Sequence, residues 1–420
     1  RRRRVASELQ RTSERIRGLE RGSAAAPAKS AKRSAPPGEA LLVYHIGTEA
    51  SFLFVVEGNS TRGYPLRVAA DHAAKLGLAA GPLTRASISQ LLFGVDARGK
   101  AIGVALLRQL ATPVGSGAPA RAIESMNERL HALFVTLMPA DVWPRVRVLQ
   151  NVTVVPDGPL AAFPFEACVT VPGQVVSDWL GDGPVIRYAP SLAALDALAA
   201  RTSNGTKSNT ILSVCNPHYA PASKLSPLPG TEREAESVVT AFGKNRVTTL
   251  CGDAATEFAV RKSIADKEVV HLATHGLVAG GRSDLLSSLA LTPASPGDLR
   301  DDGFLHLFEI YDLSLAAELV VLSACESSAG NYVLGEGVMA LARGFLSAGA
   351  RRVVATQWKV DDDATAALVG DFLARFAAAE RAQESIDYAR ALRDAKRASR
   401  ARAEWSQPFY WAAFVISGAR

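Results

Sequence analysis

The stretches VVHLATHGL at 269–277 and LVVLSACESSAG at 319–330 decide the fold of this chain. Each starts as a short apolar run and passes into small residues at one reactive side chain, His275 in the first and Cys325 in the second. Short apolar runs bounded in this way are typical of buried strands. We therefore expect two buried strands, each with a reactive side chain where the strand gives way to small residues.

From residue 210 onward, short β-branched segments alternate with amphipathic helical segments. Examples are TILSVCNP followed by TEREAESVVTAF, and RRVVATQW followed by DATAALVGDFLARFA. This alternation predicts an α/β fold in which a mostly parallel sheet carries helices on both faces. Ligands bind at the carboxyl ends of the strands in such sheets. We therefore expect His275 and Cys325 to lie at that edge.

The composition excludes several classes of protein. With 420 residues, 48% of them hydrophobic, the chain is long enough for two or three domain-sized units and a sizeable core. The formal charge of +6 comes from basic residues in the first 33 positions, where no aromatic residues are interleaved, and this disfavours a nucleic-acid partner. No segment approaches the roughly 18–20 uninterrupted apolar residues of a membrane span, so we expect no membrane partner.

The cysteines predict the compartment. Cys168, Cys215, Cys251 and Cys325 lack any C-x-x-C spacing, which disfavours both a disulfide framework and a structural zinc site. We therefore expect a reducing, cytoplasmic setting. Because the chain begins with RRRR and not with methionine, we also expect it to be a piece of a longer protein.

The two reactive side chains together favour a cysteine-nucleophile site. A neighbouring imidazole lowers the thiol pKa from about 8.5 and so supplies the reactive thiolate. Gly276 follows His275, and the small residues Ser323 and Ala324 precede Cys325, so a substrate carbonyl could approach backbone N–H groups that stabilise an oxyanion. Taken singly, each residue could equally well fill the core, where free cysteines are common.

Several longer motifs resemble one family. The motifs that carry the resemblance are YHIGTEASFLFVV, VTVVPDGPLAAFPFEA, NPHY, LPGTEREAE, VVHLATHG, LVVLSACESSAG, GEGVMALARGFLSAGARRVVATQWKVDDDAT and PFYWAAFVISG. In these motifs the chain resembles CHAT-domain caspase-like cysteine peptidases, which belong to the wider group of caspases, separase and gingipains and include members that serve in bacterial regulated proteolysis. The resemblance covers roughly 40–420. It implies a caspase-like three-layer fold, Cys325 as nucleophile, His275 as general base, an oxyanion hole at the backbone N–H groups of Gly276 and Cys325, and no cofactor or metal.

We divide the chain into three parts. Residues 1–38 read as a basic, flexible tail or linker, and TSNGTKSN at 202–209 is the boundary between two folded parts. The resemblance implies that 39–204 is a pseudo-protease-like α/β half without a catalytic pair and that 205–420 is the peptidase half. In the first half we expect strands at ALLVYHIG, SFLFVVEG and 146–158, and a helix around 119–138.

The acidic stretch WKVDDD at 358–363 bears on substrate specificity. At least one of its aspartates is expected to cap the following helix. In basic-specific relatives a carboxylate near this position lines the S1 pocket, where it recognises arginine or lysine. Asp361 is our first choice for that role and Asp362 the second, with Trp358 and Ser323 as further pocket residues; Trp358 could equally be a core residue, and an uncharged P1 residue stays open.

Two other interpretations are weighed against the peptidase. The H-x-x-x-H spacing of His271 and His275 suggests a helical zinc site, but no glutamate follows the first histidine and the segment is β-branched. A caspase-like scaffold that binds partners without cutting them is the alternative function. For a peptidase we expect a protein substrate and control by a regulatory protein or an upstream domain, with the segment 278–306 as a lid.

Overall fold

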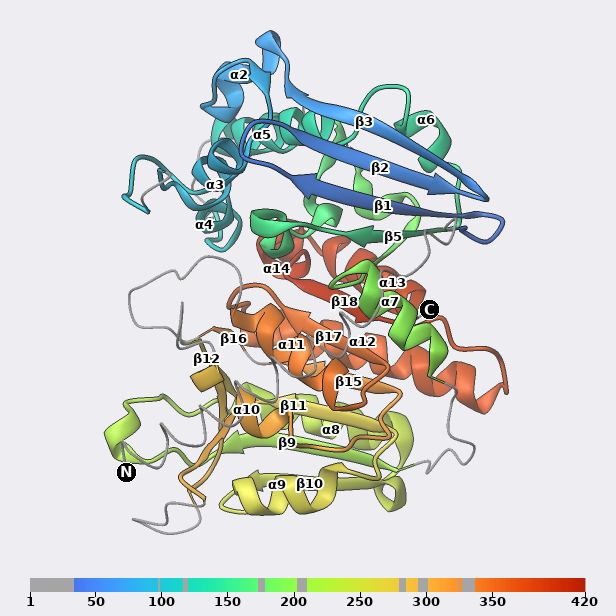
Figure 1. Ribbon diagram of the computed structural model, residues 1–420. Coiled ribbons are helices and arrows are strands. Elements are labelled where there is room, and N and C mark those ends of the chain that lie inside the picture. Colours follow the sequence, from blue (N-terminus) through green and yellow to red (C-terminus); the bar gives the residue numbers. More distant parts are fainter. Residues whose placement is uncertain are drawn as a thin grey trace.

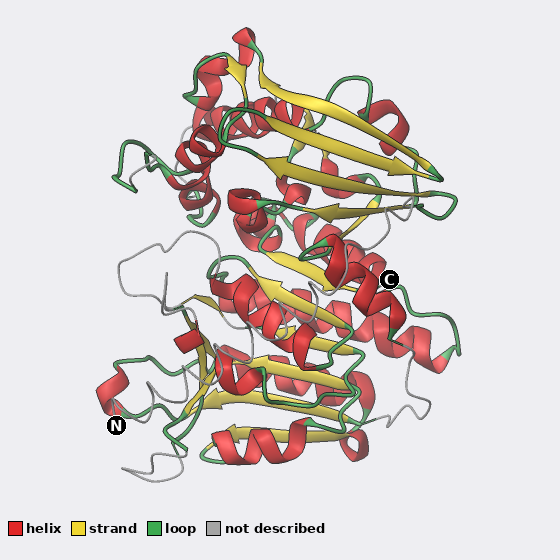
Figure 2. Ribbon diagram, viewed as in Figure 1, coloured by secondary structure: helices red, strands yellow, loops and turns green. Residues whose placement is uncertain are grey.

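The computed structural model describes residues 34–96, 99–115, 120–172, 178–201, 210–278, 285–293, 301–323, 325–326 and 337–419. Within these residues one sheet of twelve strands runs through the whole molecule, with helices packed against it (Figures 1 and 2). Its strand order is β10-β9-β11-β15-β17-β18-β8-β5-β1-β2-β3-β4. The predicted α/β class with a large, mostly parallel sheet is confirmed.

The second half of the chain supplies six neighbouring strands of this sheet. They are β9 (Ile211–Pro217), β10 (Val247–Gly252), β11 (Val269–Ala273), β15 (Leu319–Leu322), β17 (Arg352–Thr356) and β18 (Phe414–Gly418). All neighbouring pairs among them are parallel except β17 with β18, which is antiparallel. The runs VVHLATHGL and LVVLSACESSAG thus supply β11 and β15, which pair directly with each other in the middle of this half.

Helices cover both faces of these strands, so this half has three layers. One face packs against α8 (Gly230–Phe242), α12 (Asp362–Arg381), α13 (Tyr388–Arg400) and α14 (Pro408–Trp411), and the other against α9 (Glu257–Ile264), α10 (Leu307–Ile310) and α11 (Gly337–Ala348). The residues of β11 alternate between these layers. Val269 joins the core on the α8 and α12 side, whereas Val270 and Leu272 join the core on the α9 and α11 side, as the twofold periodicity of a strand requires.

The first half continues the same sheet. Its strands β1 (Glu39–Ile46), β5 (Asn151–Val155) and β8 (Val185–Tyr188) are parallel, and β2 (Ser51–Glu57), β3 (Ser60–Val68) and β4 (Gly81–Pro82) extend them in antiparallel order. A separate ribbon consists of β6 (Val169–Val171) and β7 (Asp178–Trp179). The helices of this half are α2 (Ala70–Leu76), α3 (Arg85–Phe93), α4 (Leu106–Leu110), α5 (Ala120–Leu137), α6 (Trp143–Val146) and α7 (Leu192–Ala200).

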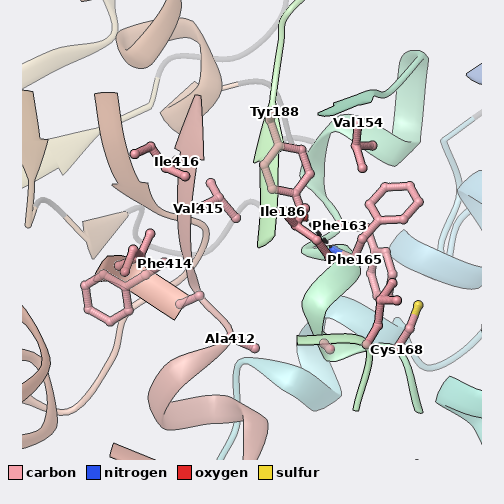
Figure 3. Packing of buried hydrophobic residues seen from close by; sticks show 14 of the residues in the cluster. Val154, Phe163, Phe165, Cys168, Ile186, Tyr188, Ala412, Phe414, Val415 and Ile416 are labelled. Carbon is pink, nitrogen blue, oxygen red and sulfur yellow. Dashed lines mark hydrogen bonds between the residues drawn. The ribbon is translucent and has the colours of Figure 1, made fainter. Parts of the chain in front are cut away.

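The two halves share one core. Strand β18 pairs in parallel with β8 through Ser417 and Tyr188. Figure 3 shows Phe414, Val415 and Ile416 of β18 in the same apolar cluster as Phe163 and Phe165 of the first half. A buried ion pair crosses the same junction, with Lys396 Nζ 2.8 Å from Glu166 Oε1. The predicted boundary at 202–209 lies outside the described residues.

The cysteines correct one prediction. Cys215 on β9 and Cys251 on β10 form a disulfide, with their Cα atoms 4.6 Å apart. The two residues are 36 positions apart in sequence, but the helix α8 between them returns the chain to the next parallel strand, where Cys251 stands in register with Cys215. Since disulfides are rare in cytosolic proteins, this pair gives no support to the predicted cytoplasmic setting. Cys168 is a buried free thiol.

Within the described ranges, none of the helices combines the length and the apolar character needed to cross a bilayer.

Candidate active site

The site lies where two central strands leave the large sheet. Beyond β11 the chain continues as β12 (His275–Leu277), and beyond β15 it continues as β16 (Cys325–Glu326). These extensions form a second sheet with β13 (Ser288–Ala290) and β14 (Phe304–His306), in the order β14-β13-β12-β16. Strands β12 and β16 are parallel neighbours, as their parent strands are.

The register of these extensions brings the predicted pair together. His275 stands opposite Cys325, and Gly276 opposite Glu326. Adjacent strands lie about 4.8 Å apart, so the backbones of His275 and Cys325 are close enough for their side chains to meet. The side chain of Cys325 itself lies outside the described part of the chain.

The imidazole of His275 is buried, with the residue only 5% exposed. Its Nε2 atom lies 2.8 Å from the backbone oxygen of Ser226. A carbonyl oxygen can only accept a hydrogen bond, so Nε2 must carry the proton. In the neutral ring, Nδ1 then holds the free lone pair and is the atom that can take a proton from a neighbour.

The surroundings of His275 favour its uncharged form. Burial is the largest influence and lowers the pKa of His275, and the nearby Lys359 lowers it further. The hydrogen bond to Ser226 and the negative charge of Asp362 act in the opposite direction. The imidazole is therefore neutral at neutral pH, as a proton acceptor must be.

Tyr219 packs directly against this imidazole. The centroids of the two rings are 5.0 Å apart, at an interplanar angle of 55°. The Tyr219 hydroxyl lies 3.1 Å from Thr274 Oγ1, and Thr274 donates its own hydroxyl proton to the backbone oxygen of Ala290. Neither Tyr219 nor Ser226 was predicted as a site residue. The only signal was the motif NPHY, since neither residue type indicates catalysis by itself.

The predicted pocket residues Trp358 and Ser323 are both buried. Trp358 is 4% exposed and belongs to the core, where its indole Nε1 donates to the backbone oxygen of Phe409 at 3.0 Å. Ser323 follows β15 directly, and its hydroxyl has no hydrogen-bond partner among the described residues. The alternative of a core tryptophan at 358 therefore agrees with the structure.

The three aspartates of WKVDDD have different surroundings. Asp361 is the N-cap of α12, and its carboxylate accepts from the backbone N–H groups of Asp363 and Ala364 at 3.0 Å, which confirms the predicted cap. Asp363 forms an ion pair with Arg233 of α8. Asp362 is the carboxylate whose charge acts on His275.

Asp362 also lies close to the first turn of α8. A Cβ atom added at Gly230 would come within 2.7 Å of the Asp362 Cβ atom, so only glycine allows this approach. Asp362 is thus a better candidate than Asp361 for a carboxylate beside the imidazole, because the Asp361 carboxylate is held by the helix cap.

His271 has a different environment from His275. It is fully buried on β11, where Nδ1 lies 3.0 Å from Ser213 Oγ and Nε2 lies 3.0 Å from Glu234 Oε2. Both ring nitrogens are occupied by these partners. Among the residues that the structure describes, no group of three histidine, cysteine or acidic side chains could hold a metal ion.

The predicted lid is described only in part. Residues 285–293 and 301–306 supply β13 and β14 beside β12, whereas 279–284 and 294–300 lie outside the described residues.

Fold and site together define an α/β protein with a histidine and a cysteine on adjacent strand ends. The CHAT domain family model matches residues 127–419. The chain therefore belongs to the CHAT domain family, and the resemblance found in the sequence is confirmed. The match begins inside α5, so it includes much of the first half as well as the second.

Relatives and solved structures match this chain more distantly. Tetratricopeptide repeat protein 28 is 27% identical in its human form and 28% in its mouse form over an alignment of 226 residues, and the match covers 46% of this chain. The chain covers only 8–9% of these proteins' length. The solved structure of the Arg-specific cysteine proteinase gingipain R matches with a TM-score of 0.43 and 10% identity, over 74% of this chain and 69% of the gingipain chain.

The solved structure of the Saccharomyces cerevisiae separase–securin complex matches with a TM-score of 0.49 and 13% identity, over 91% of this chain and 30% of the matched chain.

Proposed function

We propose that this chain is a cysteine endopeptidase that cleaves a protein substrate with Cys325 as nucleophile and His275 as general base. The observation that carries the proposal is the parallel register of β12 and β16, which pairs these two residues. Membership of the CHAT family supports the same assignment.

The proposed reaction begins with proton transfer from the Cys325 thiol to Nδ1 of His275. The sulfur then attacks the peptide carbonyl carbon, and backbone N–H groups of Gly276 and Cys325 stabilise the negative oxygen of the tetrahedral intermediate. When the C–N bond breaks, the imidazolium returns its proton to the leaving amine. Water, activated by the neutral imidazole, then hydrolyses the thioester and regenerates the thiol.

For substrate selection, we propose Asp362 as the carboxylate that recognises a basic P1 residue. Its charge already acts on the imidazole, so a cation bound to it would lie beside the reacting groups. Lys359 opposes this preference because its charge acts at the same place. Trp358 and Ser323, both buried, would act only from behind the pocket surface.

We further propose that a regulatory protein or an upstream domain controls the peptidase. The name of the curated relatives, tetratricopeptide repeat protein 28, agrees with control through protein–protein interaction. The assignments to bacteria and to the cytoplasm remain predictions of the sequence.

The test is cleavage of a peptide library varied at P1, read by mass spectrometry. We expect cleavage by the wild-type chain, none by Cys325→Ala, and full activity in Cys168→Ala. Cys168 is the matched control because burial raises its thiol pKa and removes it from reaction. Cleavage that persists in Cys325→Ala would refute the assignment of the nucleophile.

The alternative is a CHAT-domain scaffold that binds partners without cutting them. A chain that cleaves no peptide, and in which Cys325 does not react with a thiol probe, would favour this alternative. A reactive Cys325 without cleavage of the library would instead indicate a peptidase that needs its partner.

A further inference from the structure

We propose that Tyr219 is a positioning residue that fixes the orientation of the His275 imidazole and shields it from water. The inference rests on the proposed function, since orientation matters only if His275 moves a proton. Tyr219 comes from the segment after β9, whereas His275 lies on β12, so the contact joins two separate parts of the chain.

The ring of Tyr219 restricts the imidazole from its side. With centroids 5.0 Å apart and an angle of 55°, the rings are in direct contact. The Ser226 carbonyl fixes the imidazole at its Nε2 end. The hydrogen bond to Ser226 fixes the direction of the Nε2 edge, and the ring of Tyr219 covers part of the imidazole. Together they give Nδ1 a defined direction.

The hydroxyl of Tyr219 fixes the tyrosine in turn. Thr274 gives its proton to Ala290, so its oxygen accepts from Tyr219. Burial raises the pKa of Tyr219 to about 12, against hydrogen bonds with Thr274 and with the backbone of His275 that lower it. The phenol therefore stays protonated at every working pH and remains a donor to Thr274.

Two charged side chains also influence the protonation state of the His275 imidazole. Lys359 and Asp362 act on His275 with opposite signs, and burial exceeds both in its effect on the pKa. Tyr219 contributes to that burial, because its ring covers part of the imidazole. Removal of the ring is therefore expected to admit water and to move the pKa of His275 upward, toward its ordinary value.

The experiment is an NMR titration of histidine-labelled protein in a Cys325→Ala background, with the His275 signal assigned from His275→Gln. In Tyr219→Leu we expect the midpoint of His275 to rise toward about 6.5 and its nitrogen shifts to indicate mixed tautomers. In Tyr219→Phe, which keeps the ring, the midpoint should stay. Tyr64→Phe is the matched control, because Tyr64 is another half-buried phenol with a side-chain partner, Arg145.

Catalysis provides the second measurement. We expect kcat of Tyr219→Leu to fall on the order of 100-fold with KM unchanged, and the acid limb of kcat/KM to move to higher pH. An unchanged midpoint and tautomer in folded Tyr219→Leu would overturn the inference. Tyr219→Met gives the same information if the leucine variant does not fold. Because the titration needs no cleavage, it distinguishes failure of this inference from failure of the proposed peptidase activity.

Discussion

A single hydrogen bond at His275 determines which nitrogen of the imidazole can accept a proton. Nε2 donates to the Ser226 carbonyl, so Nδ1 is the remaining acceptor. The same bond also means that protonation of Nδ1 creates a buried cation, which the negative charge of Asp362 favours.

The pH dependence of cleavage follows from this environment. The proposed mechanism needs a neutral His275, and burial lowers the pKa of His275 below its ordinary value. We expect kcat/KM to hold as the pH falls through 6.5 and to decline only below it. Lys359→Ala should move this decline to higher pH, because the lysine charge lowers the same pKa. An acid limb that does not move would show that His275 is not the titrating base.

The preference for a P1 residue can show whether Asp362 or Asp361 binds the substrate. If Asp362 recognises a basic P1 residue, Asp362→Asn should lower kcat/KM for arginine and lysine substrates by roughly 10- to 100-fold, since an ionic hydrogen bond contributes about 1.5–3 kcal/mol. Asp361→Asn is the control, because asparagine also caps helices well. Equal losses in both variants, or a preference unchanged in Asp362→Asn, would count against Asp362.

The sequence indicated candidate residues with reactive side chains, but not the residues that contact and position them. Cys325 and His275 stood out as candidates because thiol and imidazole side chains can be reactive and because both follow apolar runs. Ser226 contributes a main-chain oxygen that any residue could supply, and Tyr219 resembles any half-buried aromatic residue. The choice among Asp361, Asp362 and Asp363 depends on the first turn of α12, which the sequence of three aspartates does not reveal.

At the scale of elements, the edge of the sheet carries a covalent link. Among the described strands, β10 pairs with β9 alone, and the disulfide joins these two strands. Closing a loop of 36 residues restricts the unfolded chain, so Cys251→Ser should destabilise the protein by roughly 4 kcal/mol in the chain-entropy model.

Thermal unfolding with and without reductant measures this contribution. Reductant should lower the Tm of the wild-type chain and leave that of Cys251→Ser unchanged. Alkylation of the unreduced, denatured chain should label Cys168 and Cys325 but neither Cys215 nor Cys251. Labelling of all four cysteines would contradict the disulfide.

Helix α9 is joined to α10 by an acidic pair that shares one cation. Arg261 contacts both Glu257 and Glu309. Burial, followed by repulsion from Glu309, raises the pKa of Glu257 to about 8, although Arg261 lowers it. A folded-state pKa above the unfolded value means that stability is lost as the pH rises from about 4.5 toward 8.

Glu257→Gln keeps the acceptor and removes the charge. We expect this variant to lose less Tm than the wild type between pH 6 and pH 9, as measured by calorimetry. Glu232→Gln, an exposed acidic residue in the first turn of α8, is the control. Identical pH slopes for Glu257→Gln and the wild type would exclude Glu257 as the source.

The elements themselves were predicted where their periodicity is clear. The strands at ALLVYHIG and SFLFVVEG are β1 and β2, and the helix expected around 119–138 is α5 at Ala120–Leu137. The strand expected over 146–158 is shorter, because Trp143–Val146 is helical and only Asn151–Val155 pairs in the sheet. Pairing partners were not predictable, which is why the disulfide between β9 and β10 was missed.

At the scale of the whole molecule, a buried ion pair joins the two halves. Lys396 on α13 meets Glu166 of the first half, and the Tyr188 hydroxyl donates to the same carboxylate. Removing one partner of a buried pair leaves a buried charge without compensation, at a cost of about 3–5 kcal/mol. We therefore expect Lys396→Met to lower the Tm of the whole chain in a single transition.

The control for this variant is Lys262→Met, an exposed lysine on α9. The double variant Lys396→Met with Glu166→Gln should recover part of the loss, because neither charge then remains. Two separate unfolding transitions in Lys396→Met would contradict a shared core.

The position of β18 in the sheet limits how far the protein can fold while it is being synthesised. Phe414–Gly418 begins 203 positions after β9 begins at Ile211 (414 − 211), yet it lies between β17 and β8 and joins the strands of both halves. While the ribosome is still synthesising the chain, β8 and β17 each present an open edge. The sheet cannot be complete until these residues have been synthesised. Any activity that depends on the complete sheet is therefore absent from a nascent chain that still lacks β18.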